Sequence, residues 1–200
     1  MLSINEGTLA IKLARKALSS YVKRKERITP KDLPPSFQEK NGVFVTLHEE
    51  GELRGCIGYP QPVMELEMAI VDSAINAGTN DPRFPKVVTE ELPKINFEVT
   101  VLTPSQPYLV NKKDLPEAVK IGKHGLIVRK GMWSGLLLPQ VATEWNFDST
   151  EFLCQTCHKA GLPLDAWIDE DTEVLYFEGQ VFSEVEPEGE VVEKDLATCG

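Results

Sequence analysis

The sequence predicts an α+β protein in which helices pack against a mostly antiparallel sheet. Segments with apolar residues at helical spacing interleave with segments in which apolar and polar residues alternate. Several of the alternating segments are joined by tight turns. Tight turns connect antiparallel strands, because parallel strands need a long crossover. We therefore expect antiparallel α+β layers rather than a doubly wound parallel sheet.

Length and composition narrow the classes of protein that fit. A chain of 200 residues, 42% of them hydrophobic, can form one domain of ordinary size with a real core. The net charge of −10 and the pI of about 4.9 disfavour binding to extended duplex nucleic acid. Residues 1–16 do not read as a signal peptide, and no apolar run approaches the roughly 20 residues of a membrane span. We therefore expect a cytoplasmic protein, not bound to a membrane, whose cysteines are mostly reduced.

Periodicity locates the elements of the first half of the chain. Apolar residues from Leu9 to Val22 recur at helical spacing, and the remaining surface of that helix is basic and solvated. Gly78 stands where a glycine commonly ends a helix, and the acidic run before Leu53 is typical of a hairpin turn. The predicted elements are a helix over residues 8–25, a strand over 42–48, a turn over 49–52, a strand over 53–59 and a helix over 63–77.

The second half of the chain opens with a strong strand over residues 94–102, in which Phe97, Val99 and Val101 share one face. The loop-like segment over residues 103–116 is the expected boundary between two lobes. After it we predict a strand over residues 124–129, a return strand over 132–138, a helix opened by Pro139, a helix over 151–160 and a strand over 173–182. Residues 186–200 are acidic, and we expect them to form a flexible end.

The stretch from Leu53 to Tyr59 is the strongest candidate for a functional site. Gly55 and Gly58 lie within one short strand, where glycine is disfavoured unless the backbone bends or another group approaches it closely. Cys56 lies between the two glycines, and a nearby cation such as Arg54 favours the thiolate form of cysteine. The alternative is a β-bulge with a small buried thiol that packs as an apolar group.

Three further residues are candidates for the functional site because of their positions in the predicted loops and strands. Arg83 lies in a loop bounded by prolines, which could hold it as a ligand for an anion, or it could be one surface charge in a turn. Glu98 lies on the polar face of its strand, facing either solvent or a cleft. His124 begins a later strand, and it could meet Cys56 only through the fold.

The run from Cys154 to His158 matches the spacing of a c-type haem attachment site. We interpret it instead as part of an amphipathic helix with Cys157 facing inward, because haem attachment belongs to exported proteins. A structural zinc site needs four ligands, and no second Cys/His pair has suitable spacing. The sequence has no phosphate-binding loop and none of the common dinucleotide, zinc-protease or hydrolase motifs. We expect no metal and no cofactor.

Several stretches together resemble one family, the AMMECR-type domain, named for the Alport syndrome, midface hypoplasia and elliptocytosis chromosomal region. The matches follow the family in order across nearly the whole chain, and the sequence resembles a free-standing prokaryotic member. The matching stretches are Leu53–Gly58, Asp81–Phe84, Glu98–Leu102, His124–Leu126, Gly135–Ala142 and Cys157 with Lys159–Pro163.

The resemblance implies a single domain over residues 1–185, with two lobes around a cleft and the Leu53–Gly58 stretch near that cleft. It implies no established reaction. It does imply an association with a Memo-like protein and a radical-SAM protein, in the set called the AmmeMemoRadiSam system, of which this domain is component A. A role for that set in modifying a nucleic acid or a small metabolite has been suggested by association alone.

Two hypotheses stay open, and the sequence does not decide whether the chain is an enzyme. In the first, the chain is an enzyme or enzyme component that acts on an anionic small molecule or nucleotide. Its catalytic residues would be Cys56, Glu98 and His124, and its substrate-binding residues would be Arg54, Gly55, Gly58, Arg83 and Gln140. In the second, the chain is a non-catalytic module that binds a ligand or the partner proteins. An inert Cys56 would favour the second hypothesis.

Overall fold

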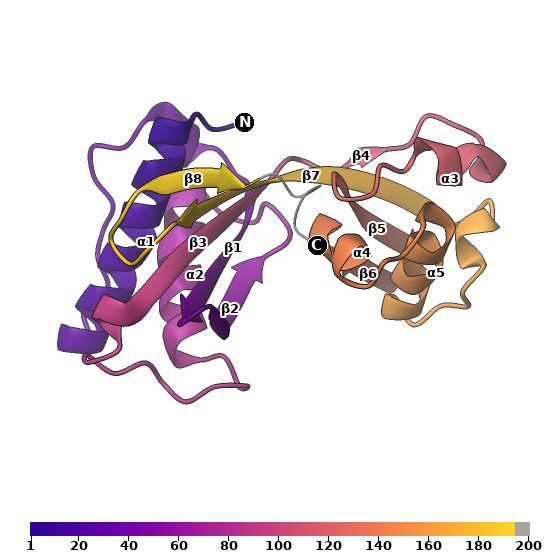
Figure 1. The fold of residues 1–200 in the computed structure, drawn as a ribbon. Helices are drawn as coiled ribbons and strands as arrows, with labels where there is room; N and C mark the ends of the chain where they lie inside the picture. Colours follow the sequence, from indigo (N-terminus) through magenta and orange to yellow (C-terminus); the bar gives the residue numbers. More distant parts are fainter. Residues whose placement is uncertain (195–200) are drawn as a thin grey trace. The chain divides into compact units, whose positions relative to one another are not determined.

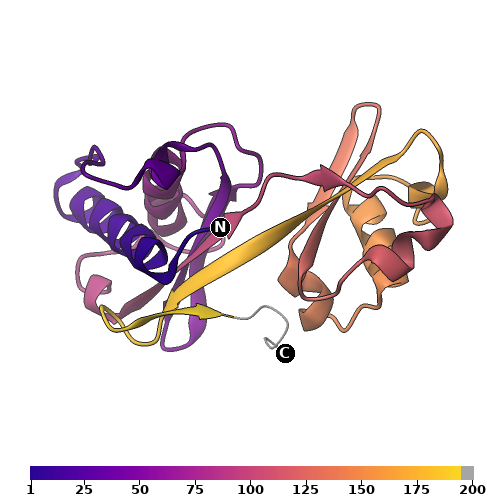
Figure 2. The same ribbon diagram turned by 90° about the horizontal axis from the view of Figure 1, so that it is seen from above.

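The computed structural model describes residues 1–194, and the chain divides into two units (Figures 1 and 2). The first unit comprises residues 1–102 and 180–194, and the second comprises residues 103–179. The division after Leu102 falls at the start of the segment that we expected to separate two lobes. A single domain whose two lobes surround a cleft stays a prediction.

The α+β prediction is confirmed, and the strand pairs for which the register is defined are antiparallel. The helices are α1 (Ile4–Arg24), α2 (Leu66–Thr79), α3 (Leu115–Ala118), α4 (Pro139–Glu144) and α5 (Ser149–Lys159). The strands are β1 (Gly42–Glu49), β2 (Glu52–Tyr59), β3 (Ile95–Leu102), β4 (Gln106–Pro107), β5 (His124–Lys130), β6 (Trp133–Leu137), β7 (Glu173–Glu184) and β8 (Val191–Lys194).

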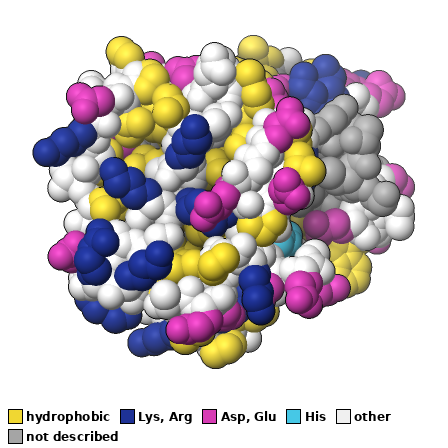
Figure 3. Space-filling view, turned by 60° about the vertical axis from the view of Figure 1, so that its left-hand side comes forward, with side chains coloured by type: hydrophobic (Ala, Val, Ile, Leu, Met, Phe, Trp, Pro, Cys, Tyr) yellow, Lys and Arg dark blue, Asp and Glu magenta, His cyan; other side chains and the backbone are white. Residues whose placement is uncertain are grey.

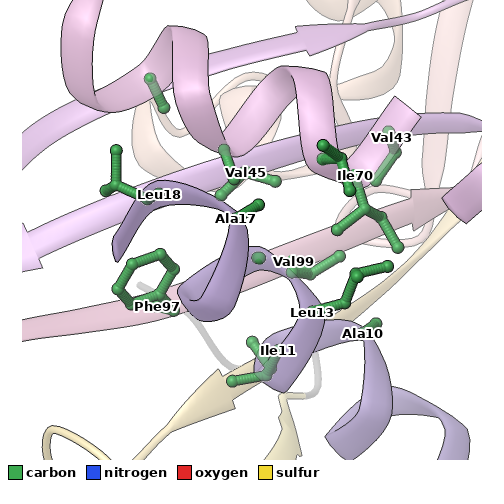
Figure 4. Close-up of a cluster of buried hydrophobic side chains, with 14 of the residues drawn as sticks. Ala10, Ile11, Leu13, Ala17, Leu18, Val43, Val45, Ile70, Phe97 and Val99 are labelled. Atoms are coloured by element: carbon green, nitrogen blue, oxygen red, sulfur yellow. The ribbon is translucent and has the colours of Figure 1, made fainter. Parts of the chain in front are cut away.

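The sheet of the first unit has the strand order β2-β1-β3-β7, and β8 pairs with β7. Helices α1 and α2 pack against one face of this sheet (Figure 1). On β1, Val43, Val45 and Leu47 point toward the helices and are fully buried, because alternate residues of a strand share a face. Figure 4 shows side chains of α1, α2, β1 and β3 meeting in this core, with Leu18 and Ile70 among them. The opposite face of the sheet has no helix of this unit packed on it, and that face carries the candidate site.

Helix α1 begins at a capping box that its sequence specifies. The Ser3 side chain accepts a hydrogen bond from the backbone N–H of Glu6, and the Glu6 carboxylate accepts one from the backbone N–H of Ser3. Ala14 and Leu18 face the core, as the helical spacing predicted. Lys and Arg side chains gather on the side of the first unit seen in Figure 3, although the whole chain is acidic.

The second unit packs its strands, in the order β4-β7-β5-β6, against α4 and α5. Asp148 caps α5 by accepting a hydrogen bond from Glu151 N, as its position before the helix predicted. Cys154 and Cys157 lie on α5, and Cys157 is fully buried in the core of this unit. Within residues 1–194 there is no group of three or more His, Cys, Asp or Glu side chains that could hold a metal ion.

The end of the chain is more ordered than its composition indicated. Residues 191–194, within the end that we expected to be flexible, form β8 and pair with β7. The acidic turn before them folds back, since Val185 N donates a hydrogen bond to Glu190 O. Cys199 lies outside the described residues. None of the helices within residues 1–194 has both the length and the apolar character of a membrane span.

Candidate functional site

The face of the first sheet that lies opposite α1 and α2 brings together two of the residues that the sequence singled out. Thr46 on β1 lies directly opposite Cys56 on β2 and also directly opposite Glu98 on β3. Directly opposite residues of antiparallel strands project from the same face, so the three side chains form one row across the sheet. We call this row, with Phe44 and His48 of β1, the Cys56 face; all five residues are half-buried.

Cys56 is a protonated thiol in this arrangement. Burial raises the pKa of the Cys56 thiol above its ordinary value. The hydrogen bond that Thr46 Oγ1 donates to Sγ over 3.3 Å and the positive charge of Arg83 oppose this only in part. The cation that favours the thiolate of Cys56 is Arg83 and not Arg54, and its effect on the pKa is smaller than that of burial. Half-burial leaves the sulfur reachable, so the thiol is accessible without being activated.

Arg54 does not act on Cys56, because a carboxylate elsewhere holds it. The Leu47–Gly55 and His48–Leu53 pairs flank a break in the strand register that leaves Arg54 as an extra residue, a bulge. Its guanidinium donates two hydrogen bonds to the Glu91 carboxylate, over 2.8 and 3.2 Å. The same group donates a third to Pro85 O over 2.9 Å. With 9% of its surface exposed, Arg54 fastens the loop after α2 to β2.

Arg83 does lie beside Cys56, but it is also held by a carboxylate. Its side chain donates to both oxygens of Asp81, over 3.0 and 2.7 Å, and donates to the backbone carbonyl of Cys56 over 3.3 Å. Asp81 in turn accepts a hydrogen bond from Cys56 N over 2.9 Å. The Arg83 hydrogen bonds hold the pKa of the nearly fully buried Asp81 carboxyl well below its usual range. Arg83 is thus already paired with a carboxylate of the protein and is not an unpaired cation at which an anionic ligand would bind.

Glu98 and His48 supply the other titratable groups of the Cys56 face. The Glu98 carboxylate forms a salt bridge of 2.7 Å with Lys194 of β8. Burial lowers the pKa of His48, and the negative charge of Glu98 opposes that effect. His48 Nε2 is buried and has no hydrogen-bond partner within residues 1–194. An unsatisfied buried polar atom is uncommon, so His48 is the residue of this face with a free hydrogen-bonding position.

Gly55 and Gly58 lie where the sequence required a close approach. A Cβ atom at Gly55 would lie 2.2 Å from the carbonyl oxygen of Ala77 in α2. A Cβ atom at Gly58 would lie 2.2 Å from the carbonyl oxygen of Val43 in β1. The two glycines therefore let β2 approach α2 on one side and β1 on the other. Their contacts are with the protein's own backbone, which gives them a structural role beside the proposed substrate-binding one.

His124 and Gln140 belong to the second unit. His124 is buried, and its Nδ1 accepts hydrogen bonds from the Tyr108 hydroxyl (2.7 Å) and the backbone N–H of Lys120 (3.3 Å). Because a backbone N–H can only donate, Nδ1 carries no proton, and the neutral ring carries its proton on Nε2. Burial lowers the pKa of His124, although Glu178 opposes this. Gln140 lies on α4, and its Oε1 is buried without a hydrogen-bond partner among the described residues.

The structure therefore brings Cys56 and Glu98 onto one face, places the Arg83 guanidinium on the backbone of Cys56, and directs Arg54 toward Glu91. Sequence reasoning missed Thr46 and His48 as members of the face. Their signal was present, since both fall on the polar side of an alternating strand. The acidic partners of the two arginines had no local signal, because only the fold shows which charges meet. Glu91 is the partner of Arg54, and Asp81 is the partner of Arg83. Lys194, the cation beside Glu98, was missed for the same reason.

Comparison with known proteins identifies the class to which this α+β fold belongs. The family model AMMECR1 matches residues 11–182. A protein from Methanosarcina barkeri is 53% identical over 98% of this chain and 99% of its own, and one from Pyrococcus furiosus is 47% identical over 95% and 93%. A crystal structure of an uncharacterized protein from Pyrococcus horikoshii is similar with a TM-score of 0.86 and 46% identity, covering 96% of this chain and 97% of that one. The chain belongs to the AMMECR1 family.

Proposed function

We propose that this chain is a non-catalytic binding module that presents the Cys56 face to a partner. The observation that carries the proposal is the state of the two arginines. Both are held by carboxylates, Arg54 by Glu91 and Arg83 by Asp81, so neither is an unpaired cation for an anionic substrate. The charge of Arg83 lowers the pKa of the Cys56 thiol, but burial, which raises it, is the larger effect. The face itself presents the half-buried Cys56 and the half-buried Phe44 ring.

The resemblance of the sequence supplies the partners for this proposal. They would be a Memo-like protein and a radical-SAM protein of the same organism, in the AmmeMemoRadiSam set, with all three proteins in the cytoplasm. A mixed face of apolar and polar groups, with its charges already paired, suits recognition by another protein surface. Association would then depend on the shape of the Cys56 face and not on the chemistry of the thiol.

One experiment tests the proposal through the reactivity of Cys56. The intact protein is treated with iodoacetamide near neutral pH, and the rate at each cysteine is followed by mass spectrometry of its peptides. We expect Cys56 to react no faster than glutathione, because burial keeps its thiol protonated. Half-buried Cys154 is the matched internal control. A rate at Cys56 far above that of glutathione overturns the proposal.

A second measurement separates a surface role from a chemical one. Cys56→Ser keeps the size of the side chain and removes the thiol, so we expect this variant to bind the partner proteins as the wild type does. Attachment of N-ethylmaleimide to Cys56 adds bulk to the same face and should abolish binding, while the Cys56→Ser protein treated in the same way should still bind. Loss of binding in untreated Cys56→Ser would contradict a purely steric role.

A second candidate function is thiol chemistry on an anionic small molecule or nucleotide. One specific observation favours it: Cys56, Thr46 and Glu98 lie in a single row, with the Thr46 hydroxyl on the sulfur. On this face the Glu98 carboxylate could transfer a proton while the Cys56 thiol acts as the nucleophile. This candidate requires fast alkylation of Cys56 and loss of function in Cys56→Ser, so the same two measurements decide between the candidates.

A further inference from the structure

The second unit contains an apolar pocket that the Cys56 face does not involve. Its volume is about 280 Å³, and residues of α4, α5, β6 and the α4–α5 connection line it (Figure 1 shows these elements together). Its walls are apolar, and two polar side chains that can carry positive charge stand at its edge. We call it the aromatic pocket and argue from Leu137, Val141, Trp145, Phe147, His158 and Lys159.

The way that α4 ends fixes the two aromatic rings of this pocket. Asn146 follows the helix with φ at 52°, the left-handed conformation that asparagine tolerates better than most residues. Phe147 N donates a hydrogen bond to Ala142 O over 2.9 Å, and Asn146 N donates one to Thr143 O over 3.3 Å. These two bonds form the Schellman ending of a helix, which folds the chain back on its last turn. The Trp145 and Phe147 rings consequently form a stacked pair, 19° from parallel with centroids 6.5 Å apart.

Trp145 does not belong to the buried hydrophobic core. Its side chain is 70% exposed, although it forms a wall of an apolar pocket floored by Leu137 and Val141. An exposed tryptophan on an apolar depression offers a large, rigid, flat surface with little conformational entropy to lose on binding. The flat group that best covers such a surface is another planar ring, stacked on the indole.

The polar edge of the pocket indicates the charge of the ligand. His158 and Lys159 form the last turn of α5, and both are exposed. Lys159 makes no salt bridge within residues 1–194, in contrast to the arginines near Cys56, whose carboxylate partners hold them. An ammonium and an imidazole on one helical turn can both donate hydrogen bonds to a phosphate or carboxylate. Small-ligand sites commonly combine apolar walls with a few such orienting groups.

We propose that the aromatic pocket binds a planar aromatic ring bearing an anionic group, with a nucleoside monophosphate as the class that fits. The ring stacks on Trp145 against Phe147, and the phosphate receives hydrogen bonds from Lys159 and His158. Recognition rests mainly on stacking and charge, and the Gln155 amide, which also lines the pocket, can donate and accept hydrogen bonds at the edge of the base.

The test uses the intact protein and three probes: AMP, adenosine and inorganic phosphate. Calorimetry measures binding, and tryptophan fluorescence reports on the indole. We expect AMP to bind and to quench, adenosine to bind more weakly, and phosphate alone to bind weakest. Trp145→Ala should weaken AMP binding roughly 5- to 160-fold, the range that loss of one stacked base supports. Lys159→Gln should weaken AMP binding and leave adenosine binding unchanged.

Trp133→Ala is the matched control, because Trp133 is another exposed tryptophan of the second unit that does not line the pocket. It should bind AMP as the wild type does. Thermal melting of each variant confirms that it is folded, which is expected because the replaced side chains are exposed. Absence of AMP binding at millimolar concentration, or equal loss in the Trp133 and Trp145 variants, overturns the proposal. Self-association that Trp145→Ala abolishes, without AMP binding, also overturns it and makes the pocket an interface between copies.

Discussion

Gly55 is a residue at which the addition of one methyl group should destabilise the fold. Gly55→Ala places a methyl group 2.2 Å from Ala77 O, and a backbone carbonyl in a helix cannot move aside cheaply. We expect the free energy of unfolding to fall by about 1–3 kcal/mol or more, the usual range for overpacking. Denaturation with urea, followed by circular dichroism, measures the change.

Gly51 in the turn between β1 and β2 is the comparison for that experiment. A Cβ atom there meets nothing within 4 Å, but φ is +87°, so the cost of Gly51→Ala comes from the backbone alone. That cost is about 1–2 kcal/mol for a left-handed residue. If Gly55→Ala proves as stable as the wild type, then β2 and α2 are not in the tight contact described here.

At the residue scale, the sequence showed which residues are unusual but not what each one touches. Gly55, Cys56 and Gly58 could be singled out because their types are rare within one strand. The Glu91 partner of Arg54 lies 37 residues along the chain, and no local pattern connects the two. The raised pKa of the Cys56 thiol follows mainly from its burial, which depends on the fold and has no local signal in the sequence.

At the element scale, Arg15 of α1 and Glu184 at the end of β7 form the principal charged link within the first unit. The two side chains pair over 2.5 and 3.0 Å, with 13% and 3% of their surfaces exposed. The same guanidinium donates hydrogen bonds to Leu92 O and Ile95 O, and it lies over the ring of Phe97. One arginine therefore joins the helix to two strands and the segment before β3.

Removing one partner of this pair should be strongly destabilising. Glu184→Ala leaves the Arg15 guanidinium with only the exposed Glu188 carboxylate, 3.7 Å away, and removes the acceptor of Phe97 N. We expect the free energy of unfolding to fall by about 3–5 kcal/mol. The double variant Arg15→Met with Glu184→Leu replaces the ions by apolar groups and should recover a large part of that loss. Equal destabilisation in the single and double variants, measured by urea denaturation, would contradict this account of the pair.

The elements themselves were largely predictable, because their apolar periodicity is strong. Helix α1 and strands β1, β2, β3, β5 and β7 lie where alternation or helical spacing placed them, within a few residues. Strand β8 was missed because its neighbours are acidic, and acidic composition indicated a flexible end. It forms because β7 offers a partner, and the register of β7 is a property of the sheet that no local window contains.

At the scale of the whole molecule, two histidines make stability depend on pH. Burial lowers the pKa values of both His48 and His124, so the unfolded chain binds protons more readily than the folded one. Stability should therefore be greatest above about pH 6.5, the ordinary histidine value, and fall as the pH decreases through the lowered values of the folded state.

Urea denaturation at a series of pH values checks this expectation. Carboxylates near their ordinary pKa values change little between about pH 7.5 and 5.5, so the histidines dominate that window. The variants His48→Gln and His124→Gln should each show a shallower loss of stability across it. The carboxylates that face these rings are Glu98 beside His48 and Glu178 beside His124. Stability that rises as the pH falls from 7.5 to 5.5 would contradict burial as the dominant effect.

The ion pair of Asp81 and Arg83 bears on whether the sheet edge at β2 can pair with strands of other chains. Strand β2 is at the end of the strand order, so its outer backbone groups could template another strand. At Cys56 both backbone groups already have hydrogen-bond partners. The N–H donates to the Asp81 carboxylate, and the carbonyl accepts from the Arg83 guanidinium. The loop thus makes, at Cys56, the hydrogen bonds that a neighbouring strand would make. The sequence indicated that the loop with Asp81 and Arg83 could bind an anion. Its hydrogen bonds to Cys56 instead block pairing of β2 with strands of other chains at this position, and we expect this to oppose aggregation.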